Sequence, residues 1–433
     1  ISNSGTAAGF GSTGEVSWNT TKITADPSTA ATGVGYFTDT SGGAFNVTLP
    51  ASPSAGNVVA VADYANTWDT NNLTIARNGS NIEGEAANFV CNQEGSSVTF
   101  VYVDATKGWV VVNSGNSSQA FGASFIVASG GNSIVTCGDF KIHKFSSPGT
   151  FTVCSVGCSA GSNTVQVLLV AGGGGGGGDR GAGAGGGGVV LTPCAGVPVT
   201  ATGFPISVGG GGTGGPGPGP GPARNGTQGT NTTGISLTAV GGGFGSGGGG
   251  GVSPDNGGPG GSGGGGAIGP GTIGSGGTAT QPSQSGNSGT FGFGNNGGGA
   301  NPAGPPNHSS GGGGGGGAVG ATGDNSKSGN GGTGKDATPI FGTAPQPFYE
   351  PSAGLYAGGG GGGASGGVGA GSGGTATAGG GPGGSNPGAP SSPNGSAGTT
   401  NTGGGGGGGA NTPGQGAGAN GGSGVVLIRY KFQ

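Results

Sequence analysis

Residues 163–181 read NTVQVLLVAGGGGGGGDRG, so an apolar run meets seven consecutive glycines. The first part, VQVLLVA, has the aliphatic and β-branched composition of a buried strand. The second part has a composition that is usually assigned to disorder, and glycine supplies 126 of the 433 residues. The chain closes with GSGVVLIRYKFQ at 422–433, a second strong strand pattern. The glycine tract is bracketed by these two strands, which predicts one sheet that clamps both of its ends.

The low charge of the chain argues against a disordered glycine tract. Charged residues make up 6% of the sequence and the formal net charge is −4, whereas disordered chains usually combine low hydrophobicity with high net charge. Polyproline-II geometry offers glycine an ordered alternative, with three residues per turn, a rise of about 3.1 Å and no internal backbone hydrogen bonds. Without Cβ atoms, neighbouring axes can approach and bond laterally. We therefore expect rods from the runs of similar length at 172–178, 311–317, 358–363 and 403–409.

Composition also divides the chain. Residues 14–116 hold all three tryptophans and short alternating runs separated by turn signals, namely VGYFTDT, AFNVTLP, NVVAVADYA, NLTIARNG, SSVTFVYVD and GWVVVNS. This pattern predicts an all-β, sandwich-like module of about 100 residues. The expected division is a linker at 1–13, this module at 14–116, a connector at 117–124, and a β-framed glycine-rich domain at 125–433 with framing strands at 125–171, 188–209, 234–240 and 424–432 and polyglycine (polyproline-II) rods and loops at 241–423. Essentially no α-helix is expected.

The charge and the short apolar runs of the chain disfavour nucleic acid and membranes as partners. The eleven Lys and Arg residues form no basic stripe, so nucleic acid is not an expected partner. The longest apolar run is far shorter than the roughly 20 residues of a membrane span, so no membrane insertion is expected. No cofactor or metal motif stands out. A chain that begins at Ile1 and contains no methionine is expected to be a fragment or a processed product.

The five cysteines lie at 91, 137, 154, 158 and 194 and match no zinc pattern. The stretch CGDFKIHKFSSPGTFTVCSVGC, residues 137–158, resembles a hairpin that turns at 147–149. Such a hairpin would place Phe145 opposite Phe151 and Cys137 opposite Cys158. Two alternatives stay open, a disulfide between Cys137 and Cys158 or free thiols.

Catalytic candidates are weak. The phosphate-loop pattern GNGGTGKD at 329–336 lacks the Ser or Thr that should follow the lysine and is not followed by a helical pattern. His143 lies on a predicted strand, where it is expected to be solvated or paired across the strands, and His308 lies in a polar loop. Glu83 and Glu85 could approach each other on one side of a strand, but a solvated edge pair is the expected outcome. We therefore expect a protein that is not an enzyme.

Binding candidates lie in the loops between glycine runs. The loop at 336–356 concentrates aromatic residues in a tract that otherwise has few, and adaptable loops that carry rings and amides are common contact surfaces. The alternative is that these rings form a lid over the rods. The candidate receptor-binding residues are Phe341, Phe348, Tyr349, Tyr356, Phe291, Phe293, Asn307 and His308.

Two parts of the sequence resemble known phage proteins. FKIHKFSSPGTFTV, VQVLLVAGGGGGGG, GISLTAVGGGFG and GSGVVLIRYKF, within about 125–433, resemble the glycine-rich domain near the ends of bacteriophage tail fibres and adhesins. GYFTDTSGGAFNVTLP and VTFVYVDATKGWVVVN resemble a tail-fibre module of marine and cyanobacterial phages.

The resemblance implies an extracellular virion tail-fibre protein, often a homotrimer, that joins other fibre or tail subunits. It also implies that loops between the rods bind a host cell-surface glycan or outer-membrane protein. The main rival is a structural extracellular or virion filament protein in which the rods are purely mechanical. Recurring copies of one loop sequence would favour the filament, and the dissimilar loops of this chain favour recognition.

Overall fold

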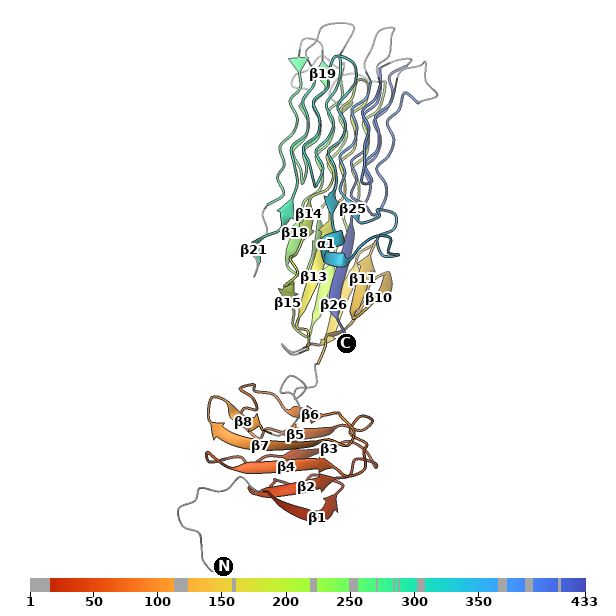
Figure 1. Cartoon of the computed structure of the whole chain (residues 1–433). Coiled ribbons are helices and arrows are strands. Elements are labelled where there is room, and N and C mark those ends of the chain that lie inside the picture. Colours follow the sequence, from red (N-terminus) through yellow and green to blue (C-terminus); the bar gives the residue numbers. More distant parts are fainter. Residues whose placement is uncertain are drawn as a thin grey trace, which may run out of the picture. The chain divides into compact units, whose positions relative to one another are not determined.

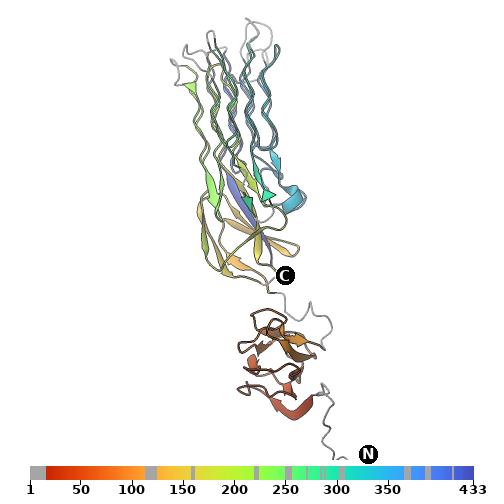
Figure 2. The same cartoon turned by 90° about the vertical axis from the view of Figure 1, so that its left-hand side faces the viewer.

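The structure is a computed structural model, drawn in two views in Figures 1 and 2. It describes residues 16–112, 124–157, 161–218, 224–248, 256–269, 272–282, 285–286, 289–301, 308–364, 372–385, 392–411 and 414–433. The chain forms two compact units, Ile1–Ser124 with Cys158–Gly161 and Phe125–Gly157 with Ser162–Gln433. The fold is all-β, and the only helix in the described residues is the four-residue α1 (Thr338–Phe341).

The N-terminal unit packs two sheets against one apolar core. The larger sheet has the order β1-β2-β4-β7-β8 and the smaller one the order β3-β5-β6. Trp68, Phe100 and Trp109 are fully buried between them. The strands are β1 (Ser17–Ile23), β2 (Val34–Thr38), β3 (Phe45–Thr48), β4 (Val58–Asp63), β5 (Leu73–Ala76), β6 (Phe89–Cys91), β7 (Ser97–Asp104) and β8 (Gly108–Val111).

The predicted runs of this unit coincide with β2, β3, β4, β5, β7 and β8. β1 was not predicted because it is a polar edge strand, SWNTTKI, whose residues are almost all exposed. β6 was not predicted because it has only three residues. The residues 83 and 85 do not share one side of a strand: Ile82 and Glu85 exchange both backbone hydrogen bonds around a tight turn.

The second unit is built on a seven-stranded sheet, here called the framing sheet. Its main order is β10-β11-β26-β13-β14-β23, and β15 pairs with β13. β13 and β26 lie antiparallel at its centre, from Gln166 opposite Arg429 to Val170 opposite Val425. The predicted pairing of the two apolar runs that bracket the glycine tract is therefore confirmed. The strands are β10 (Ser133–Cys137), β11 (Phe140–Phe145), β13 (Thr164–Val170), β14 (Val189–Leu191), β15 (Val197–Pro198), β23 (Gly292–Phe293) and β26 (Val425–Lys431).

A three-stranded sheet of order β16-β12-β9 packs on one face of the framing sheet. Its strands are β9 (Val127–Ser129), β12 (Gly149–Ser155) and β16 (Gly203–Ile206). Phe151, Val167 and Ile428 are fully buried in the shared core. Short pairs complete the unit: β17 (Thr232–Gly234) with β18 (Leu237–Ala239), β19 (Ile268–Gly269) with β20 (Thr272–Ile273), β21 (Ser285–Gly286) with β22 (Gly289–Thr290), and β24 (Lys335–Asp336) with β25 (Leu355–Tyr356).

The hairpin predicted for 137–158 is wrong. β11 pairs with β10 and β26, whereas β12 belongs to the other sheet and pairs with β9 and β16. Phe145 lies opposite Val426 and Phe151 opposite Phe204. The tight turn is instead at Gly138-Asp139, which puts Cys137 opposite Phe140, and a two-residue Gly-Asp loop is itself a hairpin signal. Cys137 is a free thiol, and Cys158 lies outside the described residues.

The glycine-rich segments form straight rods that run away from one end of the framing sheet and back, as Figures 1 and 2 show. The central rod, residues 172–178, illustrates their order, because each of its N–H groups donates to a carbonyl of a neighbouring rod at 2.8–3.1 Å. Successive N–H groups turn to different neighbours with a period of three, as polyproline-II geometry requires. The acceptor rods are 224–230, 416–422 and 182–185, and the rods that donate to it are 212–215, 242–248 and 406–409.

The six neighbours approach so closely that only glycine fits. A Cβ atom built on Gly174 would lie 2.2 Å from the carbonyl oxygen of Gly243, and one on Gly176 would lie 2.1 Å from that of Gly407. The clash is with main chain, which cannot turn aside like a side chain. The rods can therefore lie this close together only because they consist largely of glycine. Every N–H and C=O group of residues 172–178 is bonded to the main chain of a neighbouring rod.

Polar side chains replace missing neighbours at the edge of the bundle. The rod at 225–231 reads NGTQGTN, a three-residue repeat in which Gly226 faces the central rod. Asn225 and Asn231 accept the N–H groups of residues 247 and 241 at 2.8 and 2.9 Å. The hydroxyl oxygens of Thr227 and Thr230 accept those of residues 213 and 210 at 2.8 and 2.7 Å. Much of the Asn and Thr between glycines thus completes the backbone hydrogen bonding of the rods.

Candidate functional site

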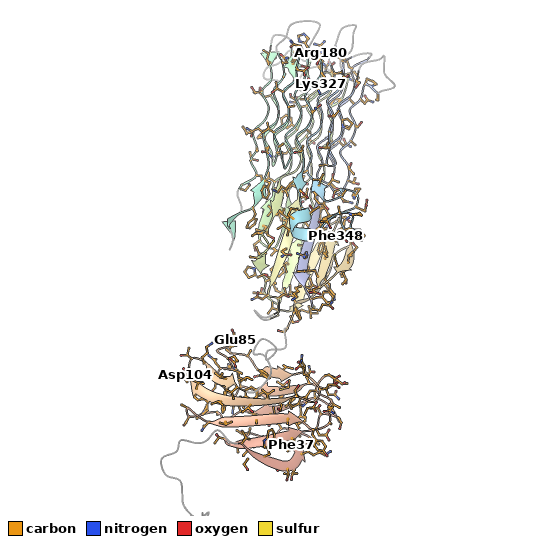
Figure 3. The ribbon with its side chains drawn as sticks, viewed as in Figure 1. Phe37, Glu85, Asp104, Arg180, Lys327 and Phe348 are labelled. Atoms are coloured by element: carbon orange, nitrogen blue, oxygen red, sulfur yellow. The ribbon has the colours of Figure 1, made fainter. Side chains whose placement is uncertain are left out.

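The aromatic loop predicted as a contact surface is a buried lid. Phe341, Phe348, Tyr349 and Tyr356 are each 1% exposed. They pack on the framing sheet, on the face opposite the three-stranded sheet, against residues such as Leu427, and Figure 3 places Phe348 beside that sheet. Rings buried to this degree offer no contact surface to a receptor, so the receptor-contact prediction for them is wrong. They do form a lid, but it covers the framing sheet and not the rods, as the alternative had expected. Burying one large apolar side chain contributes about 1.5–3 kcal/mol to the free energy of folding. Exposing these rings to contact a receptor would give up that contribution.

The two tyrosines of the lid are held neutral. The Tyr349 hydroxyl donates to the carbonyl oxygen of Gly342, and burial raises the pKa of Tyr349 well above its ordinary value. Burial also raises the pKa of Tyr356 to about 12. Both phenols therefore stay protonated even at a pH where an exposed tyrosine would ionise, which agrees with a structural role.

Phe291 and Phe293 lie beside the first residues of the lid loop, 335–340. Phe291 is 4% exposed and belongs to the core between the sheets. Phe293 is half-buried, and the Lys335 ammonium group lies 3.9 Å from its ring centroid. Together with α1 these residues line an open crevice of about 270 Å³. The two rings were predicted as candidates from the sequence, but their contact with Lys335 was not.

Asn307 lies outside the described residues. His308 is partly buried, and its Nδ1 atom has no hydrogen-bond partner among the described residues. The next residue, Ser309, bridges to Asn301 and to Ala364. His308 therefore lies where several rods end, away from the framing sheet.

We call this end of the bundle the tip. It comprises the turns at 178–181 and 323–328, the pair β19–β20, and the rod ends at Gly248, Ala364 and Asn411. Figure 1 shows β19 at this end, and Figure 3 shows Arg180 and Lys327 there. Backbone bonds join these segments; for example, Asn411 donates to Ala364 at 3.0 Å and Gly248 donates to Asp179 at 3.0 Å.

A buried ion pair fixes the centre of the tip. Asp179 and Arg224 form it with side chains that are 3% and 8% exposed. Arg224 also donates to the carbonyl oxygen of Gly248 at 3.0 Å. With its amide oriented to satisfy both neighbours, Asn411 donates to Asp179 at 2.8 Å and accepts from Arg180 at 3.0 Å. These contacts cross-link four rod ends, so the side chains around them have a rigid base.

This cluster was not predicted from the sequence, although a signal was present. Asp179 and Arg180 interrupt two glycine runs and adopt left-handed φ angles of 45° and 56°. Polar residues between glycines mark tight turns. A second charged turn lies at 324–327, where the Asp324 carboxylate accepts from the backbone of Ser326 and Lys327 at 2.7 and 2.8 Å. Hydrogen bonds from Ser326 and Lys327 hold the pKa of Asp324 below its usual value.

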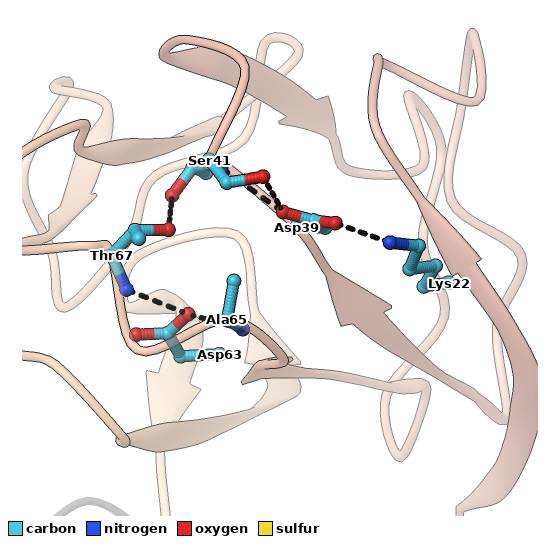
Figure 4. A network of polar contacts seen from close by, with 7 residues as sticks. Lys22, Asp39, Ser41, Asp63, Ala65 and Thr67 are labelled. Atoms are coloured by element: carbon cyan, nitrogen blue, oxygen red, sulfur yellow. Dashed lines mark hydrogen bonds and ion pairs between the residues drawn. The ribbon is translucent and has the colours of Figure 1, made fainter.

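Two carboxylates of the N-terminal unit, those of Asp39 and Asp63, have structural partners, as Figure 4 shows. Asp39 binds Lys22 at 2.6 Å and the hydroxyl of Ser41 at 2.6 Å, and these bonds lower its pKa to about 2. Asp63 accepts from the backbone of Thr67 and Trp68 at 3.3 and 3.2 Å. Asp63 thereby shapes the loop that carries the fully buried Trp68, and Asp39 shapes the turn after β2.

His143 is also a structural residue: the solvated alternative is wrong, and the cross-strand alternative is confirmed by its contact with Tyr430 on the neighbouring strand β26. It is fully buried, with Nδ1 2.7 Å from the carbonyl oxygen of Gly130 and Nε2 3.1 Å from the hydroxyl of Tyr430. Burial lowers its pKa. The described residues contain no group of His, Cys, Asp and Glu suited to a metal. In the same residues, no helix has the length and hydropathy needed to cross a bilayer.

Comparisons with known proteins agree with this architecture. The glycine-rich domain family matches residues 146–431, well over half of the chain and nearly all of the second unit. A comparison with curated proteins finds no match. The matched region begins just before β12 and ends at the last residue of β26, so it includes the β13–β26 clasp and the rods. The chain therefore belongs to the glycine-rich domain family.

Proposed function

We propose that the protein is a non-catalytic attachment protein whose tip binds a receptor on a host cell surface, as in a bacteriophage tail fibre of the marine or cyanobacterial type. The observation that carries the proposal is the cross-linked tip. A rigid scaffold of glycine rods ends in turns and loops of dissimilar sequence, and its central turn is fixed by a buried ion pair. Binding residues are often on loops that a rigid scaffold positions.

The rods themselves support a presenting role more than a chemical one. Within the described residues their interior is mostly glycine main chain bonded to main chain, and the side chains buried in it are small, such as those of Ala182, Ala184 and Ser246. The loops at the rod ends differ from one another in sequence, whereas the rods repeat one composition. Dissimilar loops on a regular, rigid support are a common arrangement for a binding surface.

The remaining parts of the proposal follow the resemblance to tail fibres. The protein would be extracellular, carried on a virion as a homotrimer together with other fibre or tail subunits. Its receptor would be a host cell-surface glycan or an outer-membrane protein. Many copies on one virion would raise weak contacts to a useful avidity. A non-catalytic role is supported by the structural engagement of Asp39, Asp63 and His143.

A matched pair of substitutions tests the proposal. Ile273 on β20 at the tip is 54% exposed, and Val319 is 59% exposed. Val319 lies near the opposite ends of the rods, because Gly316 donates to Ala357, directly after β25. Fluorescently labelled full-length protein would be bound to candidate host cells. Ile273→Glu should reduce binding at least tenfold, while Val319→Glu should leave it within twofold.

Two results would contradict this account. Equal binding by both variants and the unchanged protein would remove the tip from recognition. Absence of binding to every cell type that is susceptible to the source virion would favour the filament alternative, in which the rods have a mechanical role only.

A further inference from the structure

The crevice at the start of the lid is a second candidate site, separate from the tip. It has a volume of about 270 Å³ and is open to solvent. Three segments that are far apart in sequence form it: the end of β14, the strand β23, and the β24–α1 segment. Its lining residues are Leu191, Thr192, Pro193, Phe291, Phe293, Lys335, Asp336, Pro339 and Ile340.

The floor and the walls of the crevice are apolar. Leu191 and Phe291 are 7% and 4% exposed, and both belong to hydrophobic clusters. Phe293, Pro339 and Ile340 supply partly exposed apolar surface around them. A shape of this kind is typical of small-ligand sites, which combine apolar walls with a few placed polar groups. Its volume is close to the lower limit for such sites, so it suits one ring and not an extended chain.

Two opposite charges lie on the rim. The Lys335 ammonium group is held 3.9 Å from the Phe293 ring centroid, and within the described part of the chain it forms no ion pair. The Oδ1 atom of the Asp336 carboxylate accepts from the backbone N–H of Thr338 at 2.8 Å. Its Oδ2 atom has no hydrogen-bond partner among the residues that the structure describes. Their strand is anchored through the pairing of Lys335 with Tyr356, which is buried in the lid. The crevice thus offers one oriented donor group and one oriented acceptor.

We propose that this crevice binds a single pyranose ring. A hydrocarbon ligand would cover the two charges without giving them partners, which is costly. An anion would be repelled by Asp336 and a cation by Lys335. A neutral sugar avoids both problems, since its C–H face packs on Pro339 and Ile340 while its hydroxyl groups donate to the carboxylate and accept from the ammonium group. This inference does not depend on the function proposed for the tip.

Saturation-transfer NMR on the full chain tests the proposal. The probes are methyl glucoside, methyl galactoside, methyl mannoside and methyl N-acetylglucosaminide at 10 mM each, with glycine betaine as a zwitterionic control. At least one pyranoside should give a saturable signal with the unchanged protein. Pro339→Trp, which fills the crevice, and the double variant Lys335→Met, Asp336→Asn should each weaken the apparent affinity at least tenfold.

Matched controls separate this site from the tip. Lys327→Met removes a lysine at the tip and should leave the sugar signal within twofold, and all variants should keep the unfolding temperature of the unchanged protein within a few degrees. Three results would overturn the proposal: no signal from any pyranoside, a signal that survives both crevice variants, or binding of glycine betaine in preference to every sugar. Since the assay needs no host cell, a failed cell-binding experiment would leave it unaffected.

Discussion

The framing sheet with its lid and the rod bundle occupy one unit but are held together in opposite ways. The sheet is stabilised by side chains, such as Leu427 and Phe341, that are buried between layers. The bundle is stabilised by main chain, because six neighbours satisfy the hydrogen bonds of residues 172–178. The sheet should therefore be weakened when atoms are removed, and the bundle when atoms are added. This contrast shows how a tract with almost no hydrophobic side chains can still be ordered.

The largest expected effect is in the lid. Phe341 is 1% exposed, so Phe341→Ala leaves a cavity and should lower the free energy of unfolding by about 3–5 kcal/mol. Urea unfolding followed by near-ultraviolet circular dichroism would measure it. The control is Leu355→Ala, since Leu355 is 41% exposed and should change stability by no more than about 0.5 kcal/mol. Similar losses at both positions would contradict the lid.

The second prediction adds one methyl group to the bundle. A Cβ on Gly176 would meet a backbone oxygen at 2.1 Å, so Gly176→Ala should cost about 3 kcal/mol through overpacking and broken lateral bonds. On Gly210 the nearest atom to a Cβ is 3.9 Å away. Gly210→Ala should instead stabilise the protein by about 0.4–1 kcal/mol, because alanine lowers the entropy of the unfolded chain. Thermal unfolding of the two variants should give opposite signs; a shared sign would refute the close packing of the rods.

A smaller effect is expected at the edge of the bundle. Asn231 accepts the Gly241 N–H at 2.9 Å, whereas Gln228 on the same rod makes only a 3.4 Å contact to Gly241. Asn231→Ala should lower stability by about 1 kcal/mol, and Gln228→Ala should be close to neutral. Urea unfolding of both variants compares them directly. Equal effects would mean that the polar side chains of the rods do not replace missing neighbours.

The effect that is smallest at neutral pH comes from His143, and it grows as the pH falls. Since burial lowers the pKa of His143 in the folded protein, the unfolded chain binds a proton more readily. The free energy of unfolding should therefore fall as the pH drops below the ordinary histidine value of about 6.5, by at most about 1.4 kcal/mol per pH unit. His143→Gln should remove this part of the slope between pH 7.5 and 5. An unchanged slope would show that His143 is not the responsible group.

The sequence was informative where a single pattern decided the outcome. The two apolar runs predicted the β13–β26 pairing, because only strands that are buried on both faces carry such unbroken hydrophobicity. Glycine runs of similar length predicted rods, since disordered tracts have no reason to keep a common length. The three-residue repeat in NGTQGTN at 225–231 could also have predicted a rod at the edge of the bundle, with Asn and Thr side chains on its outer faces.

Other features depend on partners that are distant in sequence. The lid rings at 341, 348, 349 and 356 lie in a polar, proline-rich loop, and only the exposed apolar face of the framing sheet explains their burial. β11 and β12 seemed to form a hairpin because each alternates, but the competing partners were β26 and β16. The ion pair at the tip joins residues 45 positions apart, and no local pattern indicates that contact.

Amide hydrogen exchange of the central rod tests the account most directly. If lateral main-chain bonds hold the glycine rods in place, the N–H groups of residues 173–177 should be protected to the same degree as those of β13 and β26, because all would open only with the unit as a whole. Exchange of these glycines at the rate of an unstructured peptide, with the framing sheet still protected, would contradict an ordered bundle.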